Sequence, residues 1–153
     1  MITIGFLADY LDTIPTLIRW FRNQWPDYHA AMSDKEMEQD FLEDASRDRL
    51  PIRLVAFKSN QLVGTVTLRE NNPEMPPELQ PELGGLYVVE LHRKQGIATE
   101  LVRACMQLAR QQGYKTVFAT TVVAAGILER LGWEFLKTVE HEDEKLPLYR
   151  CKL

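Results

Sequence analysis

Apolar residues recur along the chain with two different periods, and the change of period separates predicted helices from predicted strands. From residue 14 to residue 25 they recur every three or four positions, which is the spacing of one buried helix face. Pro26 ends this helix, because the residue before a proline is disfavoured in helical backbone. Ser33 with Glu36 three residues later is a capping-box pattern, and it predicts a second helix that continues to Ala45.

Strands are predicted where apolar residues run together or alternate with polar ones. Ser59 and Asn60 interrupt one such stretch as a tight turn, so its two halves are expected to form a β-hairpin. The run from Leu83 to Val89 is almost wholly apolar, which predicts a strand buried on both faces. The predicted strands cover residues 1–5, 52–58, 61–70, 83–89, 116–123, 133–139 and 146–153.

A third helix follows this buried run. Its apolar stripe begins at Ile97 and includes Cys105 as a core residue, and Gly113 is placed to end it. A short fourth helix, residues 124–131, comes after the next strand. A strand, a helix and a strand in this order predict a right-handed crossover with parallel strands. The chain is therefore expected to be one mixed α/β domain over residues 1–153, without a linker.

Composition narrows the class of protein. Of 153 residues, 45% are hydrophobic and 26% are charged, which suits a core with a solvated surface. The 22 acidic and 18 basic residues give a formal charge of −4, so no nucleic-acid partner is expected. No apolar run reaches the roughly 18 residues of a membrane span, and residues 1–10 do not resemble a signal peptide. With only two cysteines, a cytoplasmic protein with no membrane partner is predicted.

The stretch from Leu86 to Thr99 carries the clearest chemical pattern, because a buried strand leads through a donor-rich loop into a helix. The first amides of a helix lack internal partners and lie at its positive dipole end, which suits a phosphate or pyrophosphate. Gly96 lets a ligand approach the backbone, while Arg93 and Lys94 add positive charge. Neither the G-x-x-x-x-G-K-[ST] loop nor the G-x-G-x-x-G loop is present.

Residues 93–98 match the pattern Q/R-x-x-G-x-G/A and lie at a predicted strand-to-helix junction, directly after the strand that contains residues 86–88. This segment resembles the acetyl-CoA signature of the GNAT N-acetyltransferase superfamily. Ala124 and residues 127–133 are similar to the later A-x-x-F-Y-x-x-x-G-F/W segment of that family. The element order and the length extend the resemblance to nearly the whole chain.

The resemblance implies a central twisted mixed β-sheet flanked by helices, in which the fourth strand bulges and splays from the fifth. In that family the pantetheine arm of acetyl-CoA fills the gap. The N–H at the position of Val88 then points at the thioester carbonyl as an oxyanion hole, and the backbone from Lys94 to Thr99 holds the pyrophosphate. The implied cofactor-binding residues are Leu86, Tyr87, Val88, Arg93, Lys94, Gln95, Gly96, Ile97, Ala98 and Thr99.

Proton transfer is where the sequence departs from the family pattern. The usual general acid is a tyrosine, and its position holds Leu128, while Thr121 replaces the usual asparagine. A leucine has no proton to give, so the alternatives are Tyr149, Tyr87 or water. A thiolate is a tolerable leaving group, because a thiol pKa lies near about 8.5. Tyr149 is the preferred side chain, since the C-terminal strand commonly approaches the splayed site in this family.

Glu70 and Glu82 stand near where the family often places a general base. The alternative for each is an exposed strand end that is only solvated. His92 has a suitable pKa for a base but is expected at the surface, as are His29 and His141. No two histidine or cysteine residues share a metal-ligand spacing, so no metal site is predicted.

The acceptor side is expected to be bounded by the two N-terminal helices and by the loop from Asn71 to Pro81. Aromatic residues of the first helix region are expected mostly in the core, with one or two of them available to line the substrate pocket. These residues are Trp20, Phe21, Trp25 and Tyr28. An acidic run, Glu140, Glu142, Asp143 and Glu144, is expected to be a solvated hairpin turn.

Two functions compete for this sequence. The first is an acetyl-CoA-dependent N-acetyltransferase, in which an amine of a small molecule, or less readily of a peptide or protein, attacks the thioester directly. The second is a non-catalytic acyl-CoA-binding or sensor module on the same fold. Leu128 supports this alternative, because a leucine cannot serve as the general acid. An interaction domain with no ligand conflicts with the donor-rich loop. A homodimer is left open, and the sequence does not identify the acceptor.

Overall fold

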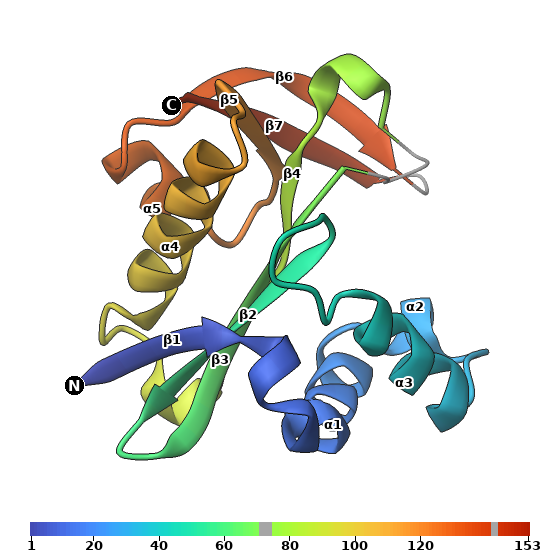
Figure 1. Cartoon of the computed structure of the whole chain (residues 1–153). Helices are drawn as coiled ribbons and strands as arrows, with labels where there is room; N and C mark the ends of the chain where they lie inside the picture. The colour runs from blue at the N-terminus through green and yellow to red at the C-terminus, as the bar shows by residue number, and fades with distance from the viewer. Residues whose placement is uncertain (71–74, 142–143) are drawn as a thin grey trace.

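Strands from the whole length of the chain meet in one mixed sheet (Figure 1). A computed structural model describes residues 1–70, 75–141 and 144–153. Within these residues seven strands pair in the order β1-β2-β3-β4-β5-β7-β6. The strands are β1 (Ile2–Phe6), β2 (Ile52–Lys58), β3 (Gln61–Arg69), β4 (Glu82–Val88), β5 (Thr116–Thr120), β6 (Glu134–His141) and β7 (Glu144–Lys152).

Helices cover both faces of this sheet. They are α1 (Ile14–Gln24), α2 (Pro26–His29), α3 (Asp34–Glu43), α4 (Ile97–Gln111) and α5 (Ala125–Arg130). In Figure 1, α4 with α5 and the group α1–α3 lie on opposite sides of β2 and β3. Side chains of β2 alternate accordingly, since Leu54 and Ala56 join the core under α4 while Val55 joins the core under α1 and α3. Cys105 is fully buried in the core under α4, as predicted.

The hairpin and the start of α3 confirm the predictions made from local sequence. Ser59 and Asn60 have φ values of 51° and 65°, and this is the left-handed backbone of a two-residue type I′ hairpin turn. At the start of α3, Ser33 Oγ accepts from Glu36 N–H at 3.1 Å. Glu36 Oε1 accepts from Ser33 N–H at the same distance, which completes the capping box.

A bulge interrupts β4 where it pairs with β3. Thr65 pairs with Tyr87 and Thr67 with Gly84, so Gly85 and Leu86 together face a single residue of β3. Gly85 has a φ of 55°, which is a backbone conformation that glycine adopts without strain. Beyond the bulge β4 leaves its parallel neighbour β5, and the register between these two strands contains one pair, Glu82 with Phe118. The bulge and the splay that the family resemblance implied are both present.

Several element boundaries differ from the predictions. Residues 84–87 of β4 are half-buried rather than buried on both faces, because β5 diverges and leaves one edge of the strand uncovered. β5 ends at Thr120, three residues earlier than predicted. Pro26 does end α1, but it also opens α2, since a proline is well tolerated in the first turn of a helix. The segment from Asn71 lies partly outside the described residues, as do Glu142, Asp143 and the side chains of Tyr28 and His141.

Candidate active site

The C-terminal end of β4 directs a backbone N–H group into the splay. Val89 N–H donates to Val63 O on β3 at 2.9 Å. Successive residues of an antiparallel strand point their N–H and C=O groups to opposite sides. Val88, one residue before, therefore points its N–H and C=O away from β3, toward the side where β5 has diverged. An N–H group at this point is available to a ligand that enters the splay.

The side chain of Arg93 binds the carbonyl group of Val88. Its Nε donates to Val88 O at 2.8 Å. Its guanidinium carbon lies 5.6 Å from the centre of the Tyr87 ring. The sequence suggested that Arg93 adds charge where a diphosphate lies, whereas here its side chain turns back onto β4. With Val63 on one side and Arg93 on the other, the peptide group between Val88 and Val89 is fixed in orientation.

The loop from β4 to α4 presents backbone amides to solvent. Lys94 and Gly96 have φ values of 64° and 85°, and α4 starts at Ile97 without a side-chain cap. A Cβ built on Gly96 has no heavy atom within 4 Å, so the space above this residue is open. Lys58 Nζ on β2 donates to Gln95 Oε1 at 2.7 Å and brings a second lysine to the loop. Sequence reasoning missed Lys58, because the hairpin carries it to this loop from a distant segment.

Ile97, the first residue of α4, is buried, whereas Ala98 and Thr99 in the same turn of the helix are half-buried. The amides of this turn have no partner inside the helix, and the helix dipole adds positive potential there. Uncapped amides, an open glycine and nearby lysines form an arrangement that suits an anion such as a phosphate.

Opposite α4, Arg53 supports the bulge from the side of α1 and α3. It is 4% exposed, and its guanidinium carbon lies 5.1 Å from the ring centres of both Phe21 and Phe41. Arg53 Nε donates to Asp44 Oδ2 at 3.0 Å. Burial lowers the pKa of Arg53, and the Asp44 carboxylate opposes that shift. A Cβ on Gly85 would lie 3.1 Å from this guanidinium, which explains the need for a small residue at the bulge. The signal in the sequence was an arginine inside the apolar strand β2.

The two glutamates considered as general bases lie at the other end of β4. The register pairs Glu82 with Arg69 and Val88 with Gly64, which separates Glu82 from Val88 by about 20 Å along the strand. Glu82 is 2% exposed rather than solvated, and its Oε1 accepts from Arg69 Nε at 2.7 Å. Glu70 accepts a hydrogen bond from Tyr114, and burial together with this bond raises the pKa of Tyr114 to about 12. The structure does not bring either glutamate to the N–H of Val88.

Tyr149 lies on β7, where it pairs with Ala119 of β5. Because β5 stands between β7 and β4, Tyr149 does not adjoin the splay. Its hydroxyl donates to Glu129 Oε1 on α5 at 3.0 Å, and this bond raises the pKa of Tyr149. Leu128, at the position of the usual tyrosine, is fully buried in the core. Cys151, also on β7, is buried as well.

Two of the histidines, His29 and His92, differ from the expected surface placement. His29 is 9% exposed, and burial, followed by the charge of Arg22, lowers its pKa. His92 is half-buried in the turn after β4.

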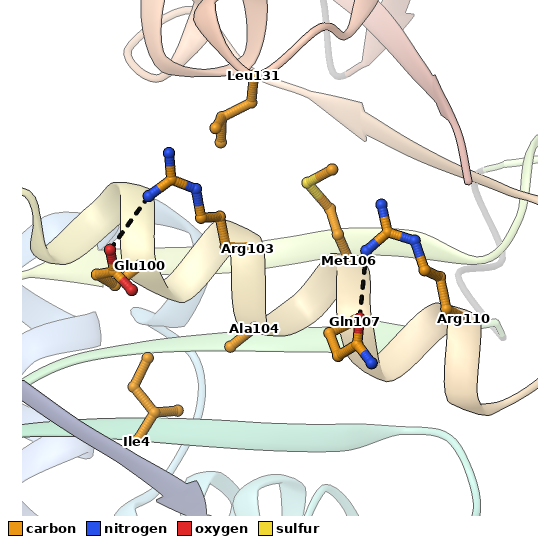
Figure 2. A pocket seen from close by; sticks show the side chains of 8 residues that line it. All are labelled: Ile4, Glu100, Arg103, Ala104, Met106, Gln107, Arg110 and Leu131. Carbon is orange, nitrogen blue, oxygen red and sulfur yellow. Dashed lines mark hydrogen bonds and ion pairs between the residues drawn. The ribbon is translucent and has the colours of Figure 1, made fainter.

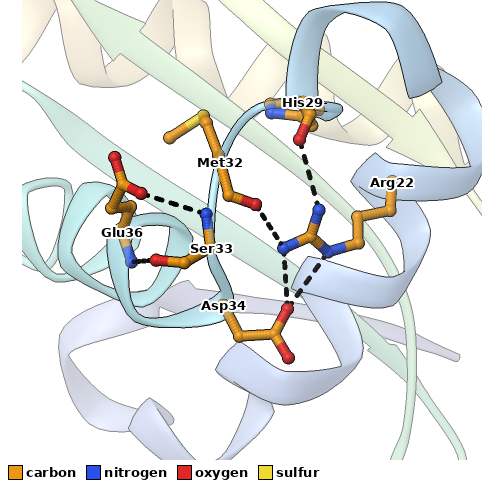
Figure 3. A network of polar contacts seen from close by, with 6 residues as sticks. All are labelled: Arg22, His29, Met32, Ser33, Asp34 and Glu36. Atoms are coloured by element: carbon orange, nitrogen blue, oxygen red, sulfur yellow. Dashed lines mark hydrogen bonds and ion pairs between the residues drawn. The ribbon is translucent and has the colours of Figure 1, made fainter.

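Figure 3 shows how Arg22 of α1 holds the chain between α2 and α3. Its guanidinium donates to His29 O at 3.2 Å, to Met32 O at 2.9 Å and to Asp34 Oδ1 at 2.7 Å.

Two hollows in the surface lie away from the splay. One of about 570 Å³ follows the outer side of α4, and Figure 2 shows Leu131 and Ile4 on opposite flanks of that helix. Its polar side chains are paired along the helix, Arg103 with Glu100 at 3.2 Å and Arg110 with Gln107 at 3.3 Å. A second hollow of about 340 Å³ contains Glu70. We therefore locate the candidate site by the backbone of β4 and not by these hollows.

Metal-binding clusters and membrane-spanning helices are both absent from the part of the chain that the structure describes. It contains no cluster of three or more histidine, cysteine, aspartate or glutamate residues placed to hold a metal ion. None of its helices combines the length and the apolar character needed to cross a bilayer.

A bulged strand whose last N–H faces a splay, followed by an uncapped helix start, is the arrangement that the family resemblance implied. The chain belongs to the acetyltransferase (GNAT) family, whose sequence profile matches residues 14–133. The family resemblance found in the sequence is thereby confirmed.

Curated relatives are described as N-acetyltransferases. N-acetyltransferase 8B of Rattus norvegicus is 32% identical over 145 residues, covering 92% of this chain and 61% of that protein. N-acetyltransferase 8 of Mus musculus is 34% identical over 123 residues, covering 74% of this chain and 49% of that protein. The chain therefore spans 49% and 61% of the lengths of these two relatives.

Solved structures share the fold over nearly all of the chain. A ribosomal-protein-alanine N-acetyltransferase from Brucella melitensis has a TM-score of 0.77 at 19% identity, covering 100% of this chain and 99% of that one. An aminoglycoside 6'-N-acetyltransferase complexed with coenzyme A has a TM-score of 0.73 at 17% identity, covering 98% and 96%. At these identities the likeness shows the fold alone.

Proposed function

We propose that this chain is an N-acetyltransferase that moves the acetyl group of acetyl-CoA directly to an amine, and that the amine belongs to a small molecule rather than to a peptide or protein. One observation carries the proposal, namely that the N–H of Val88 faces the splay directly before the uncapped start of α4. Relatives described as N-acetyltransferases and a fold neighbour complexed with coenzyme A support it.

The residues around the splay fit acetyl-CoA. The open space above Gly96 leaves room for a phosphate against the backbone, and Lys58 and Lys94 lie at the same loop. When bound, acetyl-CoA supplies an activated thioester. We assign its binding to Leu86, Tyr87 and Val88 on β4 and to Arg93, Lys94, Gln95, Gly96, Ile97, Ala98 and Thr99 in the loop and the first turn of α4. Arg93 contributes to this binding through its backbone, because its side chain is held on β4.

In this proposal Val88 N–H donates to the thioester oxygen as negative charge develops there. Its orientation is set in advance, because Arg93 and Val63 hold the next peptide group from both sides. A donor that is already oriented loses little free energy through rearrangement during the reaction. Arg93 therefore acts on the reaction by positioning β4.

Proton transfer is assigned to water. An amine must be neutral to attack, and the departing thiolate needs a proton only after release. Of the side chains that the sequence offered for these steps, Glu70, Glu82 and Tyr149 lie away from Val88. Tyr87 adjoins Val88 in the chain, but its side chain packs against the core under α1 and α3. A thiol pKa near about 8.5 makes the thiolate a leaving group that water can assist.

A non-catalytic acyl-CoA-binding module is the second candidate function, and one observation favours it. Leu128 fills the position of the usual acid and is fully buried, so no acid stands there. The two candidates differ in thiol release from acetyl-CoA in the presence of a panel of amines. An acetyltransferase releases CoA only when an amine is added, whereas a binding module shows saturable CoA binding with no amine-dependent release.

Both candidate functions predict selective binding of CoA. ATP and NAD should therefore raise the melting temperature of the protein much less than CoA does.

A cytoplasmic location and a single domain over residues 1–153 belong to the same proposal, and a homodimer stays open. Sedimentation of the purified chain over a range of concentrations measures the oligomeric state, and limited proteolysis tests for a single stable unit.

A further inference from the structure

Three aromatic side chains lie together next to the end of β4, and we call them the aromatic wall: Trp20 of α1, Trp25 directly after α1, and Tyr87 of β4. The ring centres of Trp20 and Tyr87 are 5.0 Å apart with an interplanar angle of 32°. Those of Trp25 and Tyr87 are 6.5 Å apart, with the rings edge to face. All three residues are half-buried, so each presents part of its surface to solvent.

The core does not require these exposed ring faces. The side of α1 that faces the sheet is filled by Ile14, Leu17, Ile18 and Phe21, which are all buried. Trp20 and Trp25 pack against the edge of this group, where the Trp25 ring lies 4.9 Å from that of Phe21. Both tryptophans also lie beside Tyr87 and keep part of their surface exposed. Large aromatic surfaces that folding leaves partly uncovered are typical of binding sites.

The position of the wall relates it to the reaction. Tyr87 is the residue before Val88, and its side chain packs with the core under α1 and α3. Val88 points its side chain to the opposite face, under α4. A molecule that reaches the N–H of Val88 from the side of α1 therefore passes the ring of Tyr87 and its two tryptophan neighbours.

We propose that the aromatic wall binds the non-reacting part of the acceptor, and that this part is an uncharged aromatic or apolar group. The inference rests on the proposed function and names the substrate class. Burial of such a group against three rings contributes favourable free energy that a polar substituent lacks.

The charge beside the wall argues against a polycationic acceptor. Arg93 already lies over the Tyr87 ring, at 5.6 Å from its centre. A second ammonium group on the acceptor would meet the like charge of Arg93 at the ring face that a cation prefers. Arg53 is buried nearby, between Phe21 and Phe41.

The test compares three primary amines as acceptors with saturating acetyl-CoA: 2-phenylethylamine, 2-methoxyethylamine and spermidine. We expect kcat/KM for 2-phenylethylamine to exceed that for either other amine by at least tenfold. Equal values for all three amines, or a preference for spermidine, would overturn the inference while leaving the proposed function intact.

Variants locate the preference at the wall. Trp20→Ala should raise KM for 2-phenylethylamine by at least tenfold, while kcat changes less and CoA affinity stays the same. Trp20→Leu keeps apolar volume for the fold and should still raise KM. The matched control is Phe135→Ala, which removes a 55% exposed ring from the edge strand β6. This variant should leave KM for 2-phenylethylamine, kcat and CoA affinity unchanged. An unchanged KM in both Trp20 variants would overturn the inference.

Failure of the proposed function gives a different result. If CoA binds but no amine is acetylated, the proposed function is wrong. The wall is then tested by binding alone, because two of the three tryptophans of the chain lie in it. With CoA present, 2-phenylethylamine should change the tryptophan fluorescence in a saturable manner and Trp20→Leu should weaken this binding at least tenfold. No saturable change would overturn the inference as well.

Discussion

The two sides of the splay are built in different ways. On the proposed cofactor side, the groups assigned to acetyl-CoA are backbone amides from one continuous stretch, residues 88–99. On the proposed acceptor side, the binding groups are side chains from separate elements, Trp20 of α1 and Tyr87 of β4, and the buried Arg53 of β2 supports the bulge beside them. The first side depends on backbone conformation, and the second depends on how distant elements pack.

This difference determines which changes each side tolerates. A backbone site is damaged by a side chain that blocks it or by a residue that cannot adopt its φ angles. A site made of packed side chains is damaged when one partner of a buried contact is removed. Substitutions can therefore affect one side while the other is left intact.

The largest expected effect is on the acceptor side, through the ion pair that supports the bulge. Asp44→Asn keeps the shape of the side chain but leaves the charge of Arg53 uncompensated at a position that is 4% exposed. Breaking a buried ion pair in this way is expected to lower the free energy of unfolding by about 3 kcal/mol. Urea denaturation measures the loss.

The matched control is Asp34→Asn, which breaks a second Asp–Arg pair on the same side of the sheet. The Asp34 side chain is 83% exposed, so its pair with Arg22 should contribute at most about 1 kcal/mol. Equal losses in the two variants would contradict the view that Arg53 depends on Asp44 for its burial.

The next effect belongs to the cofactor side. Gly96→Glu places a side chain and a negative charge in the open space at the start of α4. CoA affinity should fall at least tenfold, or roughly 1.4 kcal/mol, as measured by calorimetry on the folded variant. The change also places a non-glycine residue at a φ of 85°, which costs about 1 kcal/mol of stability.

Gly113→Glu separates these two consequences. Gly113 follows the C-terminal end of the same helix with a φ of 88° and with the same open space around it. It should lose similar stability and retain full CoA affinity. If both variants bind CoA as the wild-type protein does, the phosphate lies elsewhere.

The same contrast explains how much the sequence could predict. The hairpin at Ser59 and Asn60, the capping box at Ser33 and the loop around Gly96 depend on residues within a few positions of each other, and these predictions were confirmed as structural elements. Turn chemistry and capping are local, so a single sequence contains them.

Features that depend on tertiary packing were not predicted from the sequence. The apolar run of β4 predicted burial on both faces, but the departure of β5 leaves residues 84–87 half-buried. His29 was expected at the surface, but it is 9% exposed and its ring lies 6.1 Å from that of Phe21 on α1. The positions of Glu82 and Tyr149 relative to Val88 depend on strand order and register, which composition and spacing do not encode.

The smallest expected effect concerns the missing acid, and it tests whether any side chain crosses from one region to the other. Tyr149→Phe removes the hydroxyl that donates to Glu129 and little volume. Because β5 separates β7 from β4, we expect turnover within about twofold of the wild-type rate on an identified amine. A true general acid would show a loss of roughly a hundredfold or more.

Tyr87→Phe is the comparison for this last prediction, since Tyr87 precedes Val88 and has the other hydroxyl that the sequence offered as an acid. If water protonates the thiolate, both variants should turn over at similar rates, and CoA release should stay amine-dependent in each. A hundredfold loss in Tyr149→Phe alone would return the acid to β7 and require the acyl group to lie nearer to that strand than the position of Val88 indicates. A loss in Tyr87→Phe alone would place the acid in the aromatic wall, on the acceptor side of the splay.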